Sequence, residues 1–282
     1  MPIVDGPGVS LAYTTTGEGE AVTLLHGFTL NGRSWRELVS KMPKGRRWIM
    51  PDIRGHGDTR IVEGAPVTME ACAADLALLW KTLGIERTHL VGYSMGGRLA
   101  LHVAVRLPDR LRSLLTISAH AGLDEDGRAG RRQSDEALAE RIERYGIDPF
   151  VNYWAAQPMF AGLERRGPAF SGQLRAQRLA NSPEGLAASL RGMGAGAMEP
   201  VWSELPGLEI PCTFVAGEED PAYVNSARRL GATVPGAVVE IVPRSGHEVH
   251  MQRPAAMGKI LAAHLARADA ATGMSSSSLT VA

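Results

Sequence analysis

Short apolar runs alternate with amphipathic, helix-like stretches over the first 117 residues and again after residue 210. The apolar runs carry few charges, as is typical of strands buried on both faces of a parallel sheet. This alternation predicts a mostly parallel central sheet with flanking helices as crossovers. We expect a leading hairpin strand at 9–15, further strands at 21–25, 47–50, 88–91, 111–117, 212–216 and 238–242, and helices at 33–42, 68–83, 95–107, 221–231 and 254–267.

The alternation stops between residues 121 and 205, where the sequence is helical, polar and rich in arginine and glutamate. A helical insertion between two α/β stretches predicts a lid over the carboxyl edge of the sheet, where open α/β sheets bind ligands. We therefore expect an α/β core at 1–120 and 206–268, a helical lid at 121–205 and a disordered tail at 269–282.

Composition limits the classes of molecule that this protein is expected to bind. The 30 basic and 30 acidic residues balance, so nothing indicates binding to nucleic acid or to an anionic membrane. The N-terminus lacks the features of a signal peptide, and no apolar run approaches the length of a membrane span. Cys72 and Cys212 have neither metal-site nor disulfide-framework spacing. These features predict a cytoplasmic protein that acts on a small molecule and holds no metal. They leave its oligomeric state open.

The most informative segment is Gly92-Tyr93-Ser94-Met95-Gly96, which follows an apolar run and precedes a helical one. A bare G-x-S-x-G match arises by chance about 0.2 times in a chain of this composition, so the flanking elements matter. With a strand before it and a helix after it, the segment predicts a nucleophile elbow that exposes Ser94 at the end of the sheet.

A serine hydroxyl needs a histidine to take its proton and an acid to orient that histidine. His247 is the preferred base, because its loop follows the last predicted strand and so lies at the same edge as Ser94. Asp220 is the preferred acid and Glu219 the fallback, since both follow the preceding strand. Asp220 could instead only cap the helix that begins at Pro221.

Such a site also needs two backbone N–H groups to stabilise negative charge on a substrate oxygen. One is expected at Met95, directly after the serine and at the start of a helix. The other is expected at Phe28, in the loop that follows the strand at 21–25.

Further segments accompany the elbow; some are as widespread as the elbow itself, whereas the arginines and the segment around Trp154 are more particular. The segments are Leu25-His26-Gly27-Phe28, Arg98 after the elbow, His120-Ala121-Gly122-Leu123, the arginine-rich stretch 128–135, Tyr153-Trp154-Ala155-Ala156-Gln157-Pro158 and Gly246-His247-Glu248-Val249-His250. With them, the chain resembles the α/β-hydrolase superfamily over about residues 5–268. Within it, the chain resembles the pyruvate-eliminating 2-succinyl-6-hydroxy-2,4-cyclohexadiene-1-carboxylate synthases of menaquinone biosynthesis.

That resemblance implies a substrate ring with several carboxylates, bound by Arg98, Arg131 and Arg178 and enclosed by Tyr93 and Trp154. It implies that the serine–histidine–aspartate relay acts as a base that removes a ring proton while pyruvate leaves. It also implies that no metal or organic cofactor takes part.

Two other functions stay open from the sequence. One is a serine hydrolase of small esters, enol-lactones or carbon–carbon bonds; Arg54-Gly55-His56-Gly57 favours it, since the resemblance leads us to expect proline at position 54. The other is a non-catalytic receptor on the same fold, against which the complete serine, histidine and acid pattern argues. The lid arginines could also form a solvated face of i,i+4 ion pairs.

Overall fold

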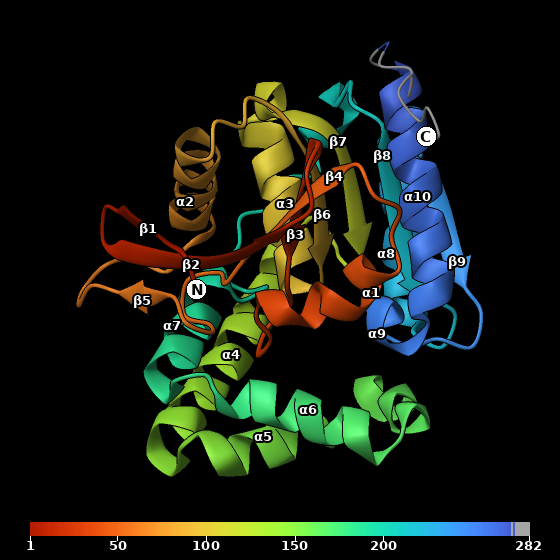
Figure 1. The fold of residues 1–282 in the computed structure, drawn as a ribbon. Helices are drawn as coiled ribbons and strands as arrows, with labels where there is room; N and C mark the ends of the chain where they lie inside the picture. Colours follow the sequence, from red (N-terminus) through yellow and green to blue (C-terminus); the bar gives the residue numbers. More distant parts are fainter. Residues whose placement is uncertain (272, 274–282) are drawn as a thin grey trace.

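The computed structural model describes residues 1–271 and 273. In this part of the chain, a nine-stranded sheet runs through the molecule with helices on both faces (Figure 1). The strand order is β1-β2-β4-β3-β6-β7-β8-β9, and β5 pairs with β2. The strands are β1 (Ile3–Gly6), β2 (Val9–Thr16), β3 (Glu20–Leu25), β4 (Arg46–Pro51), β5 (Arg60–Ile61), β6 (Thr88–Tyr93), β7 (Leu111–Ile117), β8 (Cys212–Gly217) and β9 (Val238–Val242).

The pairing is mixed at one edge and parallel elsewhere. β2 runs antiparallel to β1, β4 and β5. The other neighbours, in the order β4-β3-β6-β7-β8-β9, all pair in parallel. The α/β fold class predicted from the sequence is confirmed, and the strands at 111–117 and 238–242 have the predicted bounds. The two short strands β1 and β5 were not anticipated, because each is too brief to show a pattern of its own.

Helices on the two faces bury separate apolar cores. One core packs α2 (Met69–Thr82), α3 (Met95–Arg106) and α8 (Pro221–Thr233) against the sheet. The other packs α1 (Arg36–Ser40), α9 (Val249–Gln252) and α10 (Pro254–Ala271) against the opposite face. Neighbouring residues alternate between the cores: Leu90 and Leu114 belong to the first, Val91 and Leu115 to the second. Burial on both faces explains why these strands read as continuous apolar runs.

The insertion between β7 and β8 is helical. It contains α4 (Glu125–Tyr145), α5 (Ile147–Ala155), α6 (Pro168–Leu179) and α7 (Pro183–Met193), which lie together below the sheet in Figure 1. A small apolar core of its own, which includes Ile142, Phe150 and Leu186, joins α4, α5 and α7. That the insertion moves as a lid remains a proposal.

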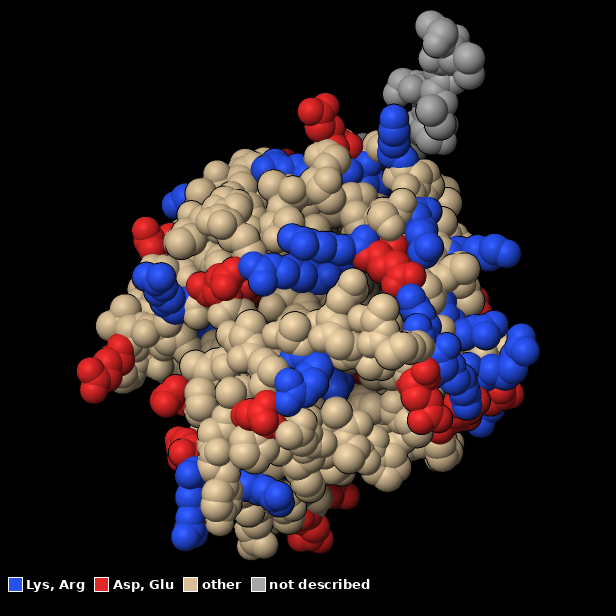
Figure 2. Space-filling model, turned by 60° about the horizontal axis from the view of Figure 1, so that its bottom comes forward, with Lys and Arg blue, Asp and Glu red and all other residues tan. Residues whose placement is uncertain are grey.

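Charged side chains of both signs are interspersed over the molecular face that includes these helices (Figure 2). Arg191 on α7 donates to Glu136 at 2.7 Å and to Glu143, both on α4. Arg128 and Arg132 pair with Glu125 at the start of α4. These arginines and glutamates of the insertion therefore form ion pairs near its surface. For them, the alternative that the lid arginines form a solvated face of ion pairs describes the structure well.

Two features at the ends of the elements complete the fold. Helix α10 continues to Ala271, so the start of the tail predicted at 269 is wrong by three residues. The remainder of that predicted tail, apart from residue 273, lies outside the described residues. Within the described chain, no helix is both long and apolar enough to span a bilayer.

Candidate active site

Ser94 occupies a strained turn between β6 and α3. Its backbone has φ 52° and ψ −112°, a conformation that L residues rarely adopt. Glycine is required on both sides, because a Cβ on Gly92 would collide with the backbone at Gly96, and a Cβ on Gly96 would collide with the carbonyl oxygens of Leu25 and His26. The turn therefore presents Ser94 at the carboxyl end of β6, as the elbow pattern predicts.

Ser94, His247 and Asp220 form a continuous hydrogen-bonded chain across three loops. His247 Nε2 lies 2.9 Å from Ser94 Oγ, and His247 Nδ1 lies 2.8 Å from Asp220 Oδ2. A carboxylate only accepts hydrogen bonds, so Nδ1 carries the proton and Nε2 is free to accept the proton of the serine. The geometry brings together the three residues selected from the sequence; their catalytic roles remain a prediction.

The two alternatives for the acid have separate outcomes. Glu219 turns away from His247 and pairs with Arg165 at 3.0 Å. Asp220 does stand at the N-cap position of α8, but its side chain makes no capping hydrogen bond and is directed to His247 instead. The geometry thus favours Asp220 as the orienting acid.

Contacts around His247 hold the relay in place. Ser118, after β7, donates to the backbone carbonyl of His247 at 2.8 Å, and the Gly246 N–H donates to Gln252. The ring of Tyr223 crosses that of His247 with a centroid distance of 4.5 Å. The sequence analysis missed these supports; the only sequence signal for Tyr223 was its place three residues after the acid.

The loop expected to supply an N–H group passes close to the serine. A Cβ on Gly27 would lie 3.4 Å from the Cβ of Ser94 and within 2.6 Å of the Tyr93 ring. His26 anchors the loop, since its Nε2 accepts from the Ile53 N–H at 2.9 Å, and burial lowers its pKa to about 4. Phe28 and Met95 both line the cavity beside Ser94, so their N–H groups remain our candidates.

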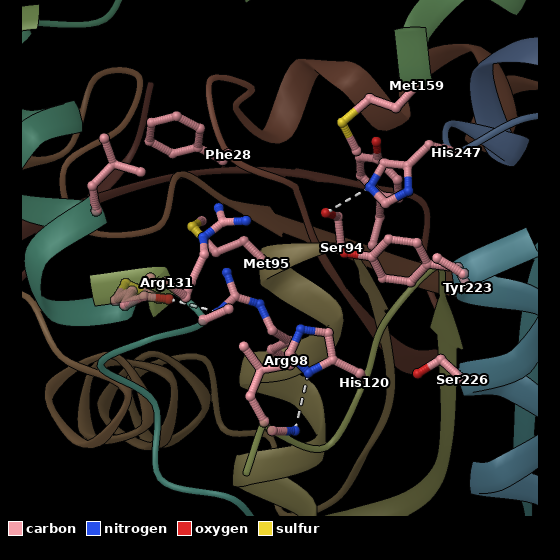
Figure 3. Close-up of a pocket in the computed structure, with 18 of the residues that line it drawn as sticks. Phe28, Ser94, Met95, Arg98, His120, Arg131, Met159, Tyr223, Ser226 and His247 are labelled. Carbon is pink, nitrogen blue, oxygen red and sulfur yellow. Dashed lines mark hydrogen bonds between the residues drawn. The ribbon is translucent and has the colours of Figure 1, made fainter. Parts of the chain in front are cut away.

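A cavity of about 510 Å³ opens at Ser94 between the sheet and the inserted helices (Figure 3). The core contributes Tyr93, Ser94 and His247, and the insertion contributes Trp154 from α5 and Leu190 from α7. Most of the wall is apolar. The described lining carries the arginines Arg98, Arg131 and Arg229, and we call the neighbouring pair of Arg98 and Arg131 the cationic part of the cavity. The remaining described residues that line it include Phe28, Met95, His120, Leu123, Met159, Phe160, Met193, Trp202, Tyr223, Ser226 and Glu248.

Arg98 is the most confined cation of the cavity. Only 9% of it is exposed, and its Nη1 donates to the carbonyl of Met193 at 2.9 Å. Burial is the main cause that lowers the pKa of Arg98 to about 10, so Arg98 stays charged at neutral pH. Among the described residues, no carboxylate forms an ion pair with it. This arginine therefore supplies a positive charge with unused N–H groups to the cavity, and its contact with a substrate stays a prediction.

The other two predicted arginines differ from each other. Arg131 lines the cavity near Arg98 while its Nε donates to Asp135 at 2.8 Å, so it combines an i,i+4 ion pair with access to the site. Arg178 is absent from the lining: it is 2% exposed, and its Nη2 donates to Glu248 at 3.2 Å. The structure thus does not place Arg178 in contact with a substrate, contrary to our expectation, because a buried carboxylate already occupies it.

Two aromatic residues behave as expected, and Arg54 proves to be structural. Tyr93 and Trp154 both line the cavity. Arg54 is buried away from it, where it donates to Asp75 at 2.8 Å and to the carbonyls of Pro66 and Pro7. The residue that departs from the expected pattern therefore has no contact with the site.

No group of three or more histidine, cysteine or acidic residues in the described chain could hold a metal ion.

Comparison with known proteins identifies the fold family. The α/β-hydrolase fold family matches residues 20–254. The chain belongs to this family. A Bacillus subtilis (strain 168) protein, named as a candidate 2-succinyl-6-hydroxy-2,4-cyclohexadiene-1-carboxylate synthase, is 35% identical over 94% of this chain and 97% of its own length.

Two solved structures extend the comparison. MenH from S. aureus superposes with a TM-score of 0.86 at 27% identity, covering 91% of this chain and 98% of that one. A thermophilic esterase from Thermogutta terrifontis gives a TM-score of 0.81 at 28% identity, covering 94% and 97%. Members of this fold family with different activities are therefore similar to this chain in structure, and the residues of the cavity must decide between them.

Proposed function

We propose that this protein is a lyase that eliminates pyruvate from 2-succinyl-5-enolpyruvyl-6-hydroxy-3-cyclohexene-1-carboxylate. The product would be the compound that names the Bacillus subtilis relative. One observation carries the proposal beyond that likeness: the Ser94–His247 pair faces a cavity in which Arg98 has no carboxylate partner among the described residues. A buried guanidinium without a counterion suits an anionic ligand, and a neutral ester would leave its charge uncompensated.

The relay would act as a base in this reaction. His247 Nε2 accepts the proton of Ser94 Oγ, and the oxygen of Ser94 removes a proton from the substrate ring. The electrons of the broken C–H bond form a new ring double bond, the existing ring double bond shifts toward the carbon that bears the enolpyruvyl group, and the C–O bond to that group breaks. The enolate of pyruvate leaves with that oxygen and is then protonated. Asp220 stabilises the imidazolium that forms on His247.

Backbone N–H groups and arginines would stabilise the negative charge of this process. The candidates are the N–H groups of Phe28 and Met95, and the latter begins α3, where the helix dipole favours an anion. Arg98 and Arg131 would bind substrate carboxylates at the cationic part of the cavity. The inserted helices α4–α7 would act as a lid that excludes water during the reaction.

The decisive experiment compares wild type with Ser94→Ala. Pyruvate release is followed by coupling to NADH oxidation, and the spontaneous decay of the substrate is subtracted. We expect the substitution to lower turnover by about 10³-fold or more without a change in melting temperature. Ser171→Ala, on the outer side of α6, is the matched control and should retain full activity. Wild-type release at the spontaneous rate would contradict the proposed reaction.

A serine hydrolase is the second candidate. The observation that favours it is the elbow itself, since a strained serine beside a histidine is also suited to forming an acyl-enzyme, which the candidate N–H groups of Phe28 and Met95 would stabilise. Labelling of Ser94 by a fluorophosphonate, together with hydrolysis of small carboxylate-bearing esters and no pyruvate release, would establish this alternative. Failure to label Ser94 and absence of both activities would instead favour a non-catalytic receptor.

A further inference from the structure

His120 lies in the wall of the cavity and takes no part in the relay. It follows β7 in the loop that begins with Ser118, the residue that supports His247. Its ring is tilted by 35° against that of Tyr223, with a centroid distance of 6.3 Å. In Figure 3 the ring lies beside the side chain of Arg98, within the cationic part of the cavity. The mechanism proposed above gives this histidine no task.

One hydrogen bond fixes which ring nitrogen carries the proton. The backbone N–H of Gly122 donates to Nδ1 of His120 at 3.1 Å. A nitrogen that accepts a hydrogen bond holds its lone pair, so in the neutral ring the proton must be on Nε2. The dashed line to Nδ1 runs away from Ser94 in Figure 3, which leaves the Nε2 edge of the ring on the cavity side.

The surroundings keep the ring neutral. Burial, followed by the positive charges of Arg98 and Arg131, lowers the pKa of His120 to about 3. The other charged residues of the cavity wall are Arg229 and Glu248, and Asp135 pairs with Arg131. At neutral pH His120 therefore offers an N–H donor without adding a further positive charge beside Arg98 and Arg131.

We propose that His120 is a specificity-determining residue that donates its Nε2–H to one oxygen of a substrate carboxylate while Arg98 donates to the other. Arg98 uses Nη1 for the carbonyl of Met193, so its remaining N–H groups stay available for the carboxylate. A neutral donor beside a cation fixes the direction of a planar carboxylate, whereas two point charges would bind it in several orientations. The proposal rests on the proposed function only in taking the substrate to be a carboxylate.

The test measures binding of succinate to the full-length protein by calorimetry, so no turnover is required. His120→Leu removes the donor, and we expect it to weaken succinate binding by about 10- to 100-fold, as for a hydrogen bond to a charged group. His120→Gln retains an N–H group near the position of Nε2 and should restore most of the affinity. Melting temperatures of both variants control for folding.

A spectroscopic measurement separates donation from a merely structural role. In protein labelled with ¹⁵N-histidine, His120 should show the Nε2–H form before succinate is added, with slower exchange of that proton afterwards. An Nδ1–H form, or wild-type affinity in a folded His120→Leu variant, would overturn the proposal, as would a wild-type protein that binds no succinate. Absence of pyruvate release would refute the lyase function alone, because these two measurements do not depend on it.

Discussion

The guanidinium of Arg178 donates to the carboxylate of Glu248 at 3.2 Å, and both side chains are almost completely buried. Glu248 directly follows His247, so the pair joins the loop of the proposed base to α6 of the insertion. Burial, the largest effect, raises the pKa of Glu248 to about 7, although Arg178 opposes it. Arg178 therefore already has a carboxyl partner outside the cavity lining, which leaves Arg98 and Arg131 as the candidates for binding carboxylates.

Breaking this pair should destabilise the protein more than replacing it. Arg178→Met leaves Glu248 without a partner, and we expect a loss of about 3 kcal/mol in the free energy of unfolding at pH 8. Arg178→Met combined with Glu248→Leu removes both charges and should recover most of that loss. Urea denaturation of the single and double variants measures the coupling. Equal losses in both would show that the pair contributes no specific interaction.

The cost of Arg178→Met should also depend on pH. The folded-state pKa of Glu248 is raised above its unfolded value, so the folded protein binds the extra proton between about pH 4.5 and 7. The contribution of Glu248 to the free energy of unfolding is therefore greater at low pH and declines as pH rises. Without Arg178 the carboxyl of Glu248 protonates readily at pH 5, whereas at pH 8 it must either stay charged without a partner or bind a proton that is then scarce. The loss caused by Arg178→Met should be smaller at pH 5, and a loss independent of pH would contradict this.

Substrate affinity should depend chiefly on Arg98. Arg98→Met removes the unpaired cation, and we expect KM to rise by about 10- to 100-fold with a smaller change in kcat. Stability should not fall, because an unpaired buried guanidinium is costly to desolvate. Arg228→Met, at an exposed position of α8, is the matched control. Steady-state measurement of pyruvate release gives both constants, and an unchanged KM would remove Arg98 from the binding site.

Acid should destabilise the protein through its buried histidines. His250 lies between the rings of Trp35 and Tyr93, and neither of its nitrogens has a hydrogen-bond partner in the described part of the chain. Burial lowers its pKa to about 3. Because the folded pKa lies below the unfolded value, the unfolded chain binds the proton as pH falls below about 6.5. Each such histidine then costs about 1.4 kcal/mol per pH unit. His250→Phe should reduce the slope of unfolding free energy between pH 6.5 and 5 by one proton. An unchanged slope would show that His250 is charged in the folded state.

The sequence predicted the relay because Ser94, Asp220 and His247 each follow a strand, and parallel strands end at one edge of the sheet. It could not predict the partner of Arg178, since Glu248 is 70 residues away and only packing brings the two together. The role proposed for His120 likewise depends on a hydrogen bond from Gly122 that has no sequence signature. Order along the chain thus identifies groups at strand ends, whereas pairing of buried charges requires the three-dimensional contacts.

The elbow should tolerate no side chain at Gly96. A Cβ there would collide with the carbonyl oxygens of Leu25 and His26, and backbone atoms cannot move aside as a flexible side chain can. Gly96→Ala should therefore lower the free energy of unfolding by about 3 kcal/mol or more and displace the loop that carries Phe28. Gly172→Ala is the matched control, because its Cβ would meet open space within α6, and it should stabilise the protein by up to about 1 kcal/mol. Urea denaturation and pyruvate release, measured on both variants, test this prediction. If the Gly96→Ala protein were as stable and as active as wild type, the close packing of α3 against the end of β3 would not be required for the site.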